Sequence, residues 1–340
     1  MINLVPTDEQ RQLAASVAEF LSQELPLSRF YPVPDARPNE DGAQWAQMAG
    51  LGFFGIGVAE EAGGVGYGLL EEMLIFREFG RFAVTTNVLA TVLGAHLAAQ
   101  AGRTDLVESF LSGAERVSLA IPMDHHLPAP PLDAEHHLID GADAAWVLVW
   151  NEGGVGLIAK ADVAQIKPVE ALDWTLPLAR ARFAADRPPL WVEDGAIARR
   201  ANVLISAYLV GMAEAARDDS VAYAKVREQF GQPIGSFQAV KHRCADMAAR
   251  TEAAWCLVLL AGLSDHYGQA DALFQISSAK LIAGDAALKN ASANIQNHGA
   301  SGFTAELEAH ILLKRAHTMM QIGGDPQTQQ KILMRQPAPV

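Results

Sequence analysis

The sequence predicts a mainly helical protein with a small β unit in the middle of the chain. Three observations support this fold class. Apolar residues recur at helical spacing in the first third, short apolar runs follow from Ser118, and long alanine-rich segments begin after Gly195. The expected domains are a helical one over residues 1–116, a small β unit over residues 117–192, and a helix bundle over residues 193–340.

The first third is expected to form several helices. Thr7 can accept a hydrogen bond from the first turn of a helix, with Gln10 at the capping-box position. Apolar residues then recur at the spacing of one helix face, at Leu13, Val17, Phe20 and Leu21. Beyond a proline-rich stretch, three further segments read as helices: 45–51, 69–79 and 84–99.

The remaining two thirds contain two different patterns. Residues 146–150 and 155–159 are short apolar runs separated by glycine, aspartate and proline, which is typical of strands. Residues 199–227 and 240–263 are long, alanine-rich and compatible with helical spacing, which is typical of a helix bundle. The expected order along the chain is therefore helical, β, helical.

Composition excludes several classes of function. The 340 residues carry a net charge of −13, so attraction to nucleic acid or to anionic lipid is not expected. No apolar run approaches the roughly 20 residues of a membrane span, and the charged first turns do not resemble a signal peptide. We expect a cytoplasmic protein whose two cysteines, Cys244 and Cys256, are free thiols.

Several features invite a chemical interpretation that their context does not support. The glycine-rich residues 63–68 resemble a phosphate-cradling loop, but no predicted strand precedes them and no Lys-Ser or Lys-Thr follows, so we predict a mobile turn between helices. The paired titratable residues lack the spacing of a metal site or an acid–base pair, so we predict solvated side chains and no metal. These pairs are His125-His126, His136-His137, Glu60-Glu61 and Glu71-Glu72.

The most informative segment is residues 223–240, which read YAKVREQFGQPIGSFQAV, with Ala-Asp-Met following at residues 245–247. Phe230-Gly231 and Pro233 are expected to end one long helix, and Ser236 can cap the next. Arg227 would then lie at a helix C-terminus beside an exposed turn.

This string resembles the signature of acyl-CoA dehydrogenases at nearly every defining position: the arginine, Phe-Gly, Pro-Ile, Phe-Gln and Ala-Asp-Met. The resemblance extends to residues 45–66 and 296–303, so it covers both helical domains. It implies the family's fold, with an N-terminal helical domain, a β-barrel or sheet that is reduced here, and a C-terminal four-helix bundle.

The resemblance also implies a cofactor and a reaction. Members bind acyl-CoA and FAD, and a glutamate removes the α-proton while the β-hydrogen moves to the flavin as hydride. By resemblance, Arg227 reaches across a dimer interface to the FAD pyrophosphate, Phe230 packs by the adenosine, and Gln238 helps to hold the dinucleotide. A guanidinium fork suits two phosphate oxygens, so the assignment of Arg227 is physically reasonable.

A second strip resembles the family's glutamine-x-x-glycine-glycine run, whose main-chain amides approach the diphosphate. Its residues here are Gln296, Asn297, His298, Gly299 and Ala300. Ala300 stands where a second glycine is usual, which bears on how closely a ligand can approach the backbone.

The family's catalytic glutamate is missing. Counting forward from Gly302-Phe303 places its usual position at Gly323, and the alternative position of some members falls on Ala201. Neither residue can accept a proton. Asp325 lies two residues further on and is an alternative base if the alignment shifts by two.

The middle of the chain also departs from the family. The threonine-glutamate-proline, glycine-serine-aspartate and tryptophan-isoleucine-threonine motifs that surround the isoalloxazine ring are absent, and residues 118–189 look shortened. The chain is therefore not expected to hold a flavin ring by itself.

The family residues that this chain retains, Arg227, Phe230 and Gln238, are those with which, by resemblance, one subunit contacts the FAD of its neighbour. The chain therefore resembles the short, non-catalytic subunits of α2β2 acyl-CoA dehydrogenases that act on steroid side chains, with FAD shared at the interface with a catalytic homologue. Two alternatives stay open: an autonomous flavoenzyme of the same fold, with Asp325 as base or with monooxygenase activity, and a cofactor-free structural paralogue.

Overall fold

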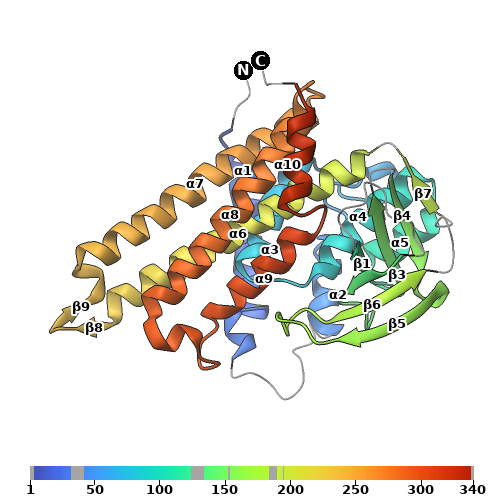
Figure 1. Cartoon of the computed structure of the whole chain (residues 1–340). Coiled ribbons are helices and arrows are strands. Elements are labelled where there is room, and N and C mark those ends of the chain that lie inside the picture. The colour runs from blue at the N-terminus through green and yellow to red at the C-terminus, as the bar shows by residue number, and fades with distance from the viewer. Residues whose placement is uncertain are drawn as a thin grey trace.

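The computed structural model describes residues 4–31, 42–123, 134–151, 154–183, 190–193 and 195–337. Its first part is helical, as Figure 1 shows. The helices are α1 (Asp8–Glu24), α2 (Gly42–Gly50), α3 (Leu69–Arg81), α4 (Thr86–Gln100) and α5 (Thr104–Leu111), with the short turns η1 (Leu27–Phe30) and η2 (Glu60–Ala62). The capping box predicted at Thr7 is present, because Thr7 and Gln10 each accept from the other's backbone N–H.

The middle part is an open sheet of seven strands in the order β5-β6-β2-β1-β3-β4-β7. The strands are β1 (Val117–Pro122), β2 (His136–Ile139), β3 (Trp146–Asn151), β4 (Gly154–Ala159), β5 (Val163–Val169), β6 (Leu178–Phe183) and β7 (Leu190–Val192), with the turn η3 (Lys160–Asp162) before β5. Among these strands β1 and β3 run parallel, and the other neighbouring pairs run antiparallel. The two strands predicted from their apolar runs are β3 and β4.

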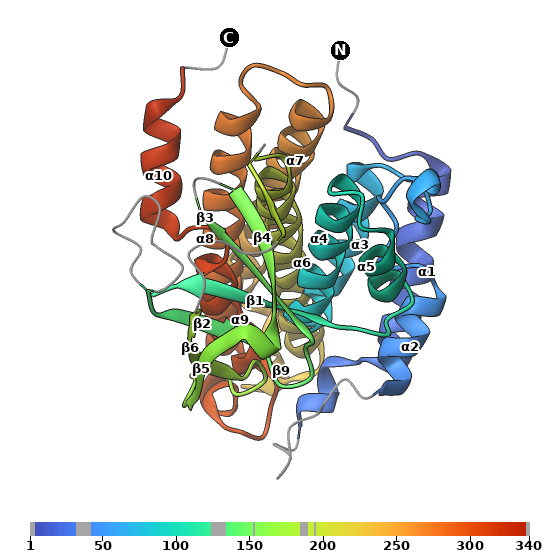
Figure 2. The ribbon, with the colours of Figure 1, turned by 90° about the vertical axis from the view of Figure 1, so that its right-hand side faces the viewer.

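The last part is the bundle. Its helices are α6 (Ala196–Val226), α7 (Gln238–His266), α8 (Ala272–His298), α9 (Ala309–Gln321) and α10 (Pro326–Arg335). Shorter elements join them: β8 (Glu228–Gln229), β9 (Gln232–Pro233), η4 (Ile234–Ser236) and η5 (Gly299–Phe303). Figure 1 shows α6, α7 and α8 side by side, with the β8–β9 hairpin at the end far from the sheet, and Figure 2 shows α1 to α5 on one side of the sheet. The predicted order of helical, β and helical parts is confirmed.

Within the described ranges α7 is long and apolar enough, by length and composition, to cross a membrane. However, 56% of its most apolar window is buried inside the protein, as in the core helix of a globular protein, and α7 packs on both α6 and α8.

The first part and the bundle meet where α3 crosses α6, and two glycines make this crossing close. A Cβ at Gly80 would lie 1.9 Å from the carbonyl oxygen of Tyr208, and one at Gly211 would lie 1.8 Å from that of Arg77. Both obstacles are backbone atoms, so the crossing leaves no room for a side chain at either position.

We therefore expect Gly211→Ala to lower the free energy of unfolding by about 3 kcal/mol or more, because the two helices must move apart. Chemical denaturation measures the change. Gly50→Ala is the control, since a Cβ at Gly50 meets nothing within 4 Å. Equal stability of the two variants would contradict the close crossing.

Candidate functional site

The two strips singled out in the sequence lie at one end of the bundle, where α6 ends, α7 begins and α8 ends (Figure 1). Side chains join these three ends. Asn297 donates from Nδ2 to Ser220 Oγ at 2.6 Å, and Arg243 donates to Asn297 Oδ1 at 2.5 Å. The structure thus brings together segments that are some 60 residues apart in the sequence.

The turn after α6 differs in detail from the prediction. The chain forms a hairpin, and Phe230 and Gly231 occupy its two-residue turn with φ of 54° and 78°. Positive φ at both residues is the geometry of a type I′ turn, which matches the twist of paired strands. The predicted cap was wrong: Ser236 lies in η4 and donates from Oγ to the carbonyl of Pro233 at 2.7 Å, while Phe237 precedes α7 without a side-chain cap.

Arg227, Phe230 and Gln238 all lie at the surface. The backbone of Arg227 is fixed, because its N–H donates to the carbonyl of Tyr223 at 2.9 Å and its carbonyl accepts from Ile234 at 2.7 Å. The Phe230 side chain is 92% exposed. Gln238 Oε1 lies 2.9 Å from His242 Nε2. The three side chains therefore project outward from a rigid backbone.

The second strip divides into two groups. Gln296, Gly299 and Ala300 are exposed, whereas Asn297 and His298 are both buried. Asn297 makes the contacts given above. His298 donates from Nδ1 to the carbonyl of Asn294 at 2.9 Å, and its ring stacks on Tyr223 at 4.0 Å between centroids.

A ligand can therefore reach this strip chiefly through its main chain. Gly299 has a φ of 66°, and a Cβ there would meet nothing within 4 Å. The backbone is open at this point. The uncapped start of α7 adds the positive end of a helix dipole to the same surface. An exposed guanidinium, open backbone and a helix N-terminus together suit a diphosphate.

The loop that contains Gly323 packs against α6 next to Ala201, so the two positions predicted for the family's base belong to one region. Ala201 is buried on α6, and Gly323 lies in the loop between α9 and α10. A Cβ at Gly323 would lie 2.5 Å from Oδ1 of Asn202, the residue after Ala201, and 3.0 Å from Lys280 Nζ. Neither predicted position carries a titratable group, and a buried amine lies beside them.

Lys280 was missed by sequence reasoning. It is 3% exposed, and its Nζ donates to Asn202 Oδ1 at 2.8 Å, to the carbonyl of Gly324 at 2.9 Å and to that of Ile322. Burial lowers the pKa of the Lys280 amine to about 7, and the Asp325 carboxylate opposes this shift. The only signal was a lone lysine within an apolar, alanine-rich helix segment.

Asp325 has a structural role. It is the N-cap of α10, and its Oδ1 accepts from the N–H of Thr328 at 2.8 Å. Pro326 follows at the first helical position, where the missing N–H costs nothing.

Two predictions of solvated titratable pairs were wrong. His136 lies on β2 and is 2% exposed, because β2 lies inside the sheet between β6 and β1 and the imidazole packs on Phe183; its Nδ1 is 2.9 Å from the carbonyl of Ala134. Glu72 is 2% exposed and contacts His96 Nε2 at 2.6 Å and the Arg200 guanidinium. Burial raises the pKa of Glu72, but the charges of His96 and Arg200 bring it below its usual value. His125-His126 lie outside the described residues.

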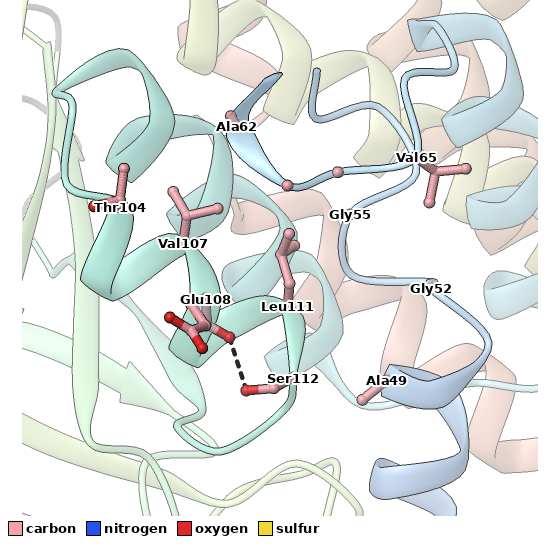
Figure 3. Close-up of a pocket in the computed structure, with 12 residues that line it drawn as sticks. Ala49, Gly52, Gly55, Ala62, Val65, Thr104, Val107, Glu108, Leu111 and Ser112 are labelled. Carbon is pink, nitrogen blue, oxygen red and sulfur yellow. Dashed lines mark hydrogen bonds between the residues drawn. The ribbon is translucent and has the colours of Figure 1, made fainter. Parts of the chain in front are cut away.

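The described residues contain no group of three or more His, Cys, Asp or Glu side chains placed to hold a metal ion. The glycine-rich residues 63–68 lie between η2 and α3, and the first three of them, Gly63, Gly64 and Val65, line an open groove of about 540 Å³. Figure 3 shows this groove between the loop from Gly52 to Val65 and α5, with Leu111 turned toward the loop. Its twelve lining residues include Glu108 but neither lysine nor arginine, which does not suit a phosphate.

Comparison with protein families gives two matches. The model of the acyl-CoA dehydrogenase C-terminal domain matches residues 198–337, and that of the N-terminal domain matches residues 7–114. Acyl-CoA dehydrogenase FadE34 of Mycobacterium tuberculosis is 35% identical over 291 residues, which are 82% of this chain and 39% of that protein. The chain thus spans well under half the length of that relative. Acyl-CoA dehydrogenase IpdE2 of the same organism is 28% identical over 326 residues, 95% of either chain.

Solved structures share the fold. A chain of the ChsE4-ChsE5 complex from Mycobacterium tuberculosis is similar with a TM-score of 0.84 and 20% identity, covering 99% of this chain and 100% of that one. A variant of the Tcur3481-Tcur3483 steroid ACAD has a TM-score of 0.82 and 22% identity, covering 96% and 97%. Butyryl-CoA dehydrogenase from Megasphaera elsdenii has a TM-score of 0.81 and 19% identity, covering 98% and 99%.

Proposed function

Because this chain belongs to the acyl-CoA dehydrogenase family, a family of oxidoreductases, we propose that it is an accessory subunit of an FAD-dependent acyl-CoA dehydrogenase. It lacks the catalytic glutamate and donates contacts to the ADP part of an FAD that a homologous catalytic subunit holds. The proposed assembly is an α2β2 heterotetramer in the cytoplasm, inactive as this chain alone.

The observation that carries the proposal is the direction of the kept side chains. Arg227, Phe230 and Gln238 project outward from the end of the bundle, so a cofactor that they contact lies outside the fold of this chain. Three large apolar side chains are exposed on nearby segments, at Val226 (76%), Phe230 (92%) and Phe303 (77%). Exposed large apolar side chains at one end of a bundle are typical of a surface that a partner covers.

The residues present fit the dinucleotide part of FAD. The Arg227 fork and the open backbone at Gly299 suit phosphate oxygens, and the Phe230 ring suits an adenosine face. When bound, FAD would accept the hydride that dehydrogenation releases. This chain offers no carboxylate at Gly323 or Ala201 to remove the accompanying proton, and the catalytic partner would supply it.

The substrate class follows from analogy. One relative of the same fold is described as a steroid ACAD, and another is a complex of two named chains. By analogy, we propose that the substrate is a bulky acyl-CoA, such as a steroid side-chain thioester. We also propose that the chain works with a different, homologous subunit.

The test is flavin content and acyl-CoA-driven flavin reduction, compared between the chain purified alone and the chain co-expressed with a catalytic homologue from the same genome. We expect bound FAD, and bleaching by a steroid side-chain thioester, only in the mixed complex. A yellow, substrate-reducible protein from this chain alone would instead support an autonomous flavoenzyme. Absence of flavin from both preparations, despite a stable complex, would support a cofactor-free paralogue.

A further inference from the structure

The loop between α9 and α10 is held by two buried side chains. Lys280 Nζ donates to the carbonyls of Ile322 and Gly324, and Gln329 Nε2 donates to the carbonyl of Gly323 at 2.8 Å. Lys280 is 3% exposed and Gln329 is 1% exposed. Each of the three successive carbonyls therefore has a hydrogen-bond donor inside the protein. Lys280 of α8 and Gln329 of α10 together hold the conformation of the loop.

The amine of Lys280 has no N–H left for a ligand. It donates to the two loop carbonyls and to Asn202 Oδ1, which makes one acceptor for each hydrogen of an ammonium group. A buried ammonium is stable only when it is paired and fully hydrogen-bonded, and the Asp325 carboxylate supplies the opposite charge nearby. The Lys280 amine thus joins α8 to α6 and to the loop.

The same loop is unfavourable for a side chain at Gly323. The residue has a φ of 74°, in the left-handed region that favours glycine, and Gly324 follows with a φ of 97°. A Cβ at Gly323 would lie 2.5 Å from Asn202 Oδ1, well inside contact distance. The backbone conformation and the neighbouring polar groups therefore both oppose a side chain at this position.

We infer that Lys280, Asn202 and Gln329 form an internal tie across the position predicted for the family's base, and that this tie fixes the loop between α9 and α10 in a conformation that leaves no base at Gly323. This inference rests on the proposed function, because the proposed function identifies Gly323 as the position of the family's catalytic glutamate. Restoring the carboxylate would therefore require the loop or the Asn202 side chain to move.

The first test compares the same substitution at two lysines of α8. Lys280→Met leaves three acceptors unpaired, so we expect Tm of the full chain to fall by about 5 °C or more. Amide exchange of Thr328 and Gln329, which donate to Asp325, should quicken by about tenfold or more. Lys289→Met is the control, since that side chain is 59% exposed and pairs with Asp285 one turn earlier in the same helix. Equal Tm and equal exchange in both variants would overturn the tie.

A second measurement needs no variant. In native wild-type chain treated with acetic anhydride, mass spectrometry should find Lys289 acetylated and Lys280 unmodified until the chain is unfolded. Acetylation of Lys280 at the rate of Lys289 would show an open loop and contradict the proposal.

The third test restores the carboxylate. We expect Gly323→Glu to lower Tm of this chain, because the left-handed backbone and the Asn202 side chain both oppose a side chain there. A Gly323→Glu chain with wild-type Tm would overturn the inference. Tm and labelling are measured on this chain without flavin or partner, so a negative result would contradict the tie and leave the accessory-subunit proposal intact. Absence of flavin from the mixed complex would contradict the accessory-subunit proposal and leave the tie intact.

Discussion

Arg315→Ala is expected to lower the free energy of unfolding by about 3–5 kcal/mol, because it leaves a buried carboxylate without its cation. The Arg315 side chain is 1% exposed, and that of its partner Asp173 is equally buried. Five acceptors surround the guanidinium: Asp173 Oδ2 (2.8 Å), Thr175 Oγ1 (2.7 Å), the carbonyls of Ala83 (2.9 Å) and Val84 (3.1 Å), and the Tyr208 hydroxyl (2.9 Å). These groups come from α6, from the turn after α3 and from the connection between β5 and β6, so all three parts of the chain lose a contact.

Chemical denaturation measures this change, and Arg103→Ala is the matched control. Arg103 pairs with Asp105 at the surface, where an ion pair contributes little, so its loss should leave the denaturation midpoint unchanged. The double change Arg315→Met with Asp173→Leu should recover part of the lost stability, since it removes the unpaired charge. An Arg315→Ala chain that unfolds at the same midpoint as Arg103→Ala would refute the role of this cluster.

Arg227→Ala is expected to weaken FAD binding by the mixed complex by about 10–100-fold, the effect of losing a charge-assisted contact to phosphate. The measurement is flavin stoichiometry after gel filtration, followed by FAD titration of the stripped complex. Arg227→Lys should fall between wild type and alanine, since an ammonium keeps the charge but lacks the planar fork.

Lys225→Ala is the control for Arg227, because Lys225 is an exposed cation in the last turn of the same helix. Its loss should leave the flavin content unchanged. Retention of full flavin by the Arg227→Ala complex would contradict the proposed interfacial site, even if the complex itself assembles normally.

Local sequence patterns were sufficient for much of the fold. Apolar periodicity predicted α1, α3, α4, α6 and α7, and the capping box at Thr7 marked the start of α1 within the same turn. The predicted β3 and β4 followed from short apolar runs, whereas β5, with mostly exposed side chains, offered no such run. Sequence alone thus identified elements whose core-facing pattern is strong.

Contacts between distant residues could not be predicted in this way. Lys280 meets Asn202 78 residues away, and Glu72 meets Arg200 128 residues away. Glu72 was predicted to be solvated and Lys280 was not singled out, because nothing in the segment around either residue reveals its partner. The resemblance located the strips at 227–238 and 296–300, but it could not show that Asn297 and His298 face inward.

The close crossing of α3 and α6 has a consequence for synthesis of the chain on the ribosome. Arg77 of α3 and its partner Glu214 of α6 are 137 residues apart. The face of α3 that contains Gly80 therefore has no α6 to pack against until most of the protein has been made. At ordinary elongation rates this interval lasts roughly 10–30 s. During that time the N-terminal helices expose an apolar face, and chaperone binding to the nascent chain should end when α6 emerges.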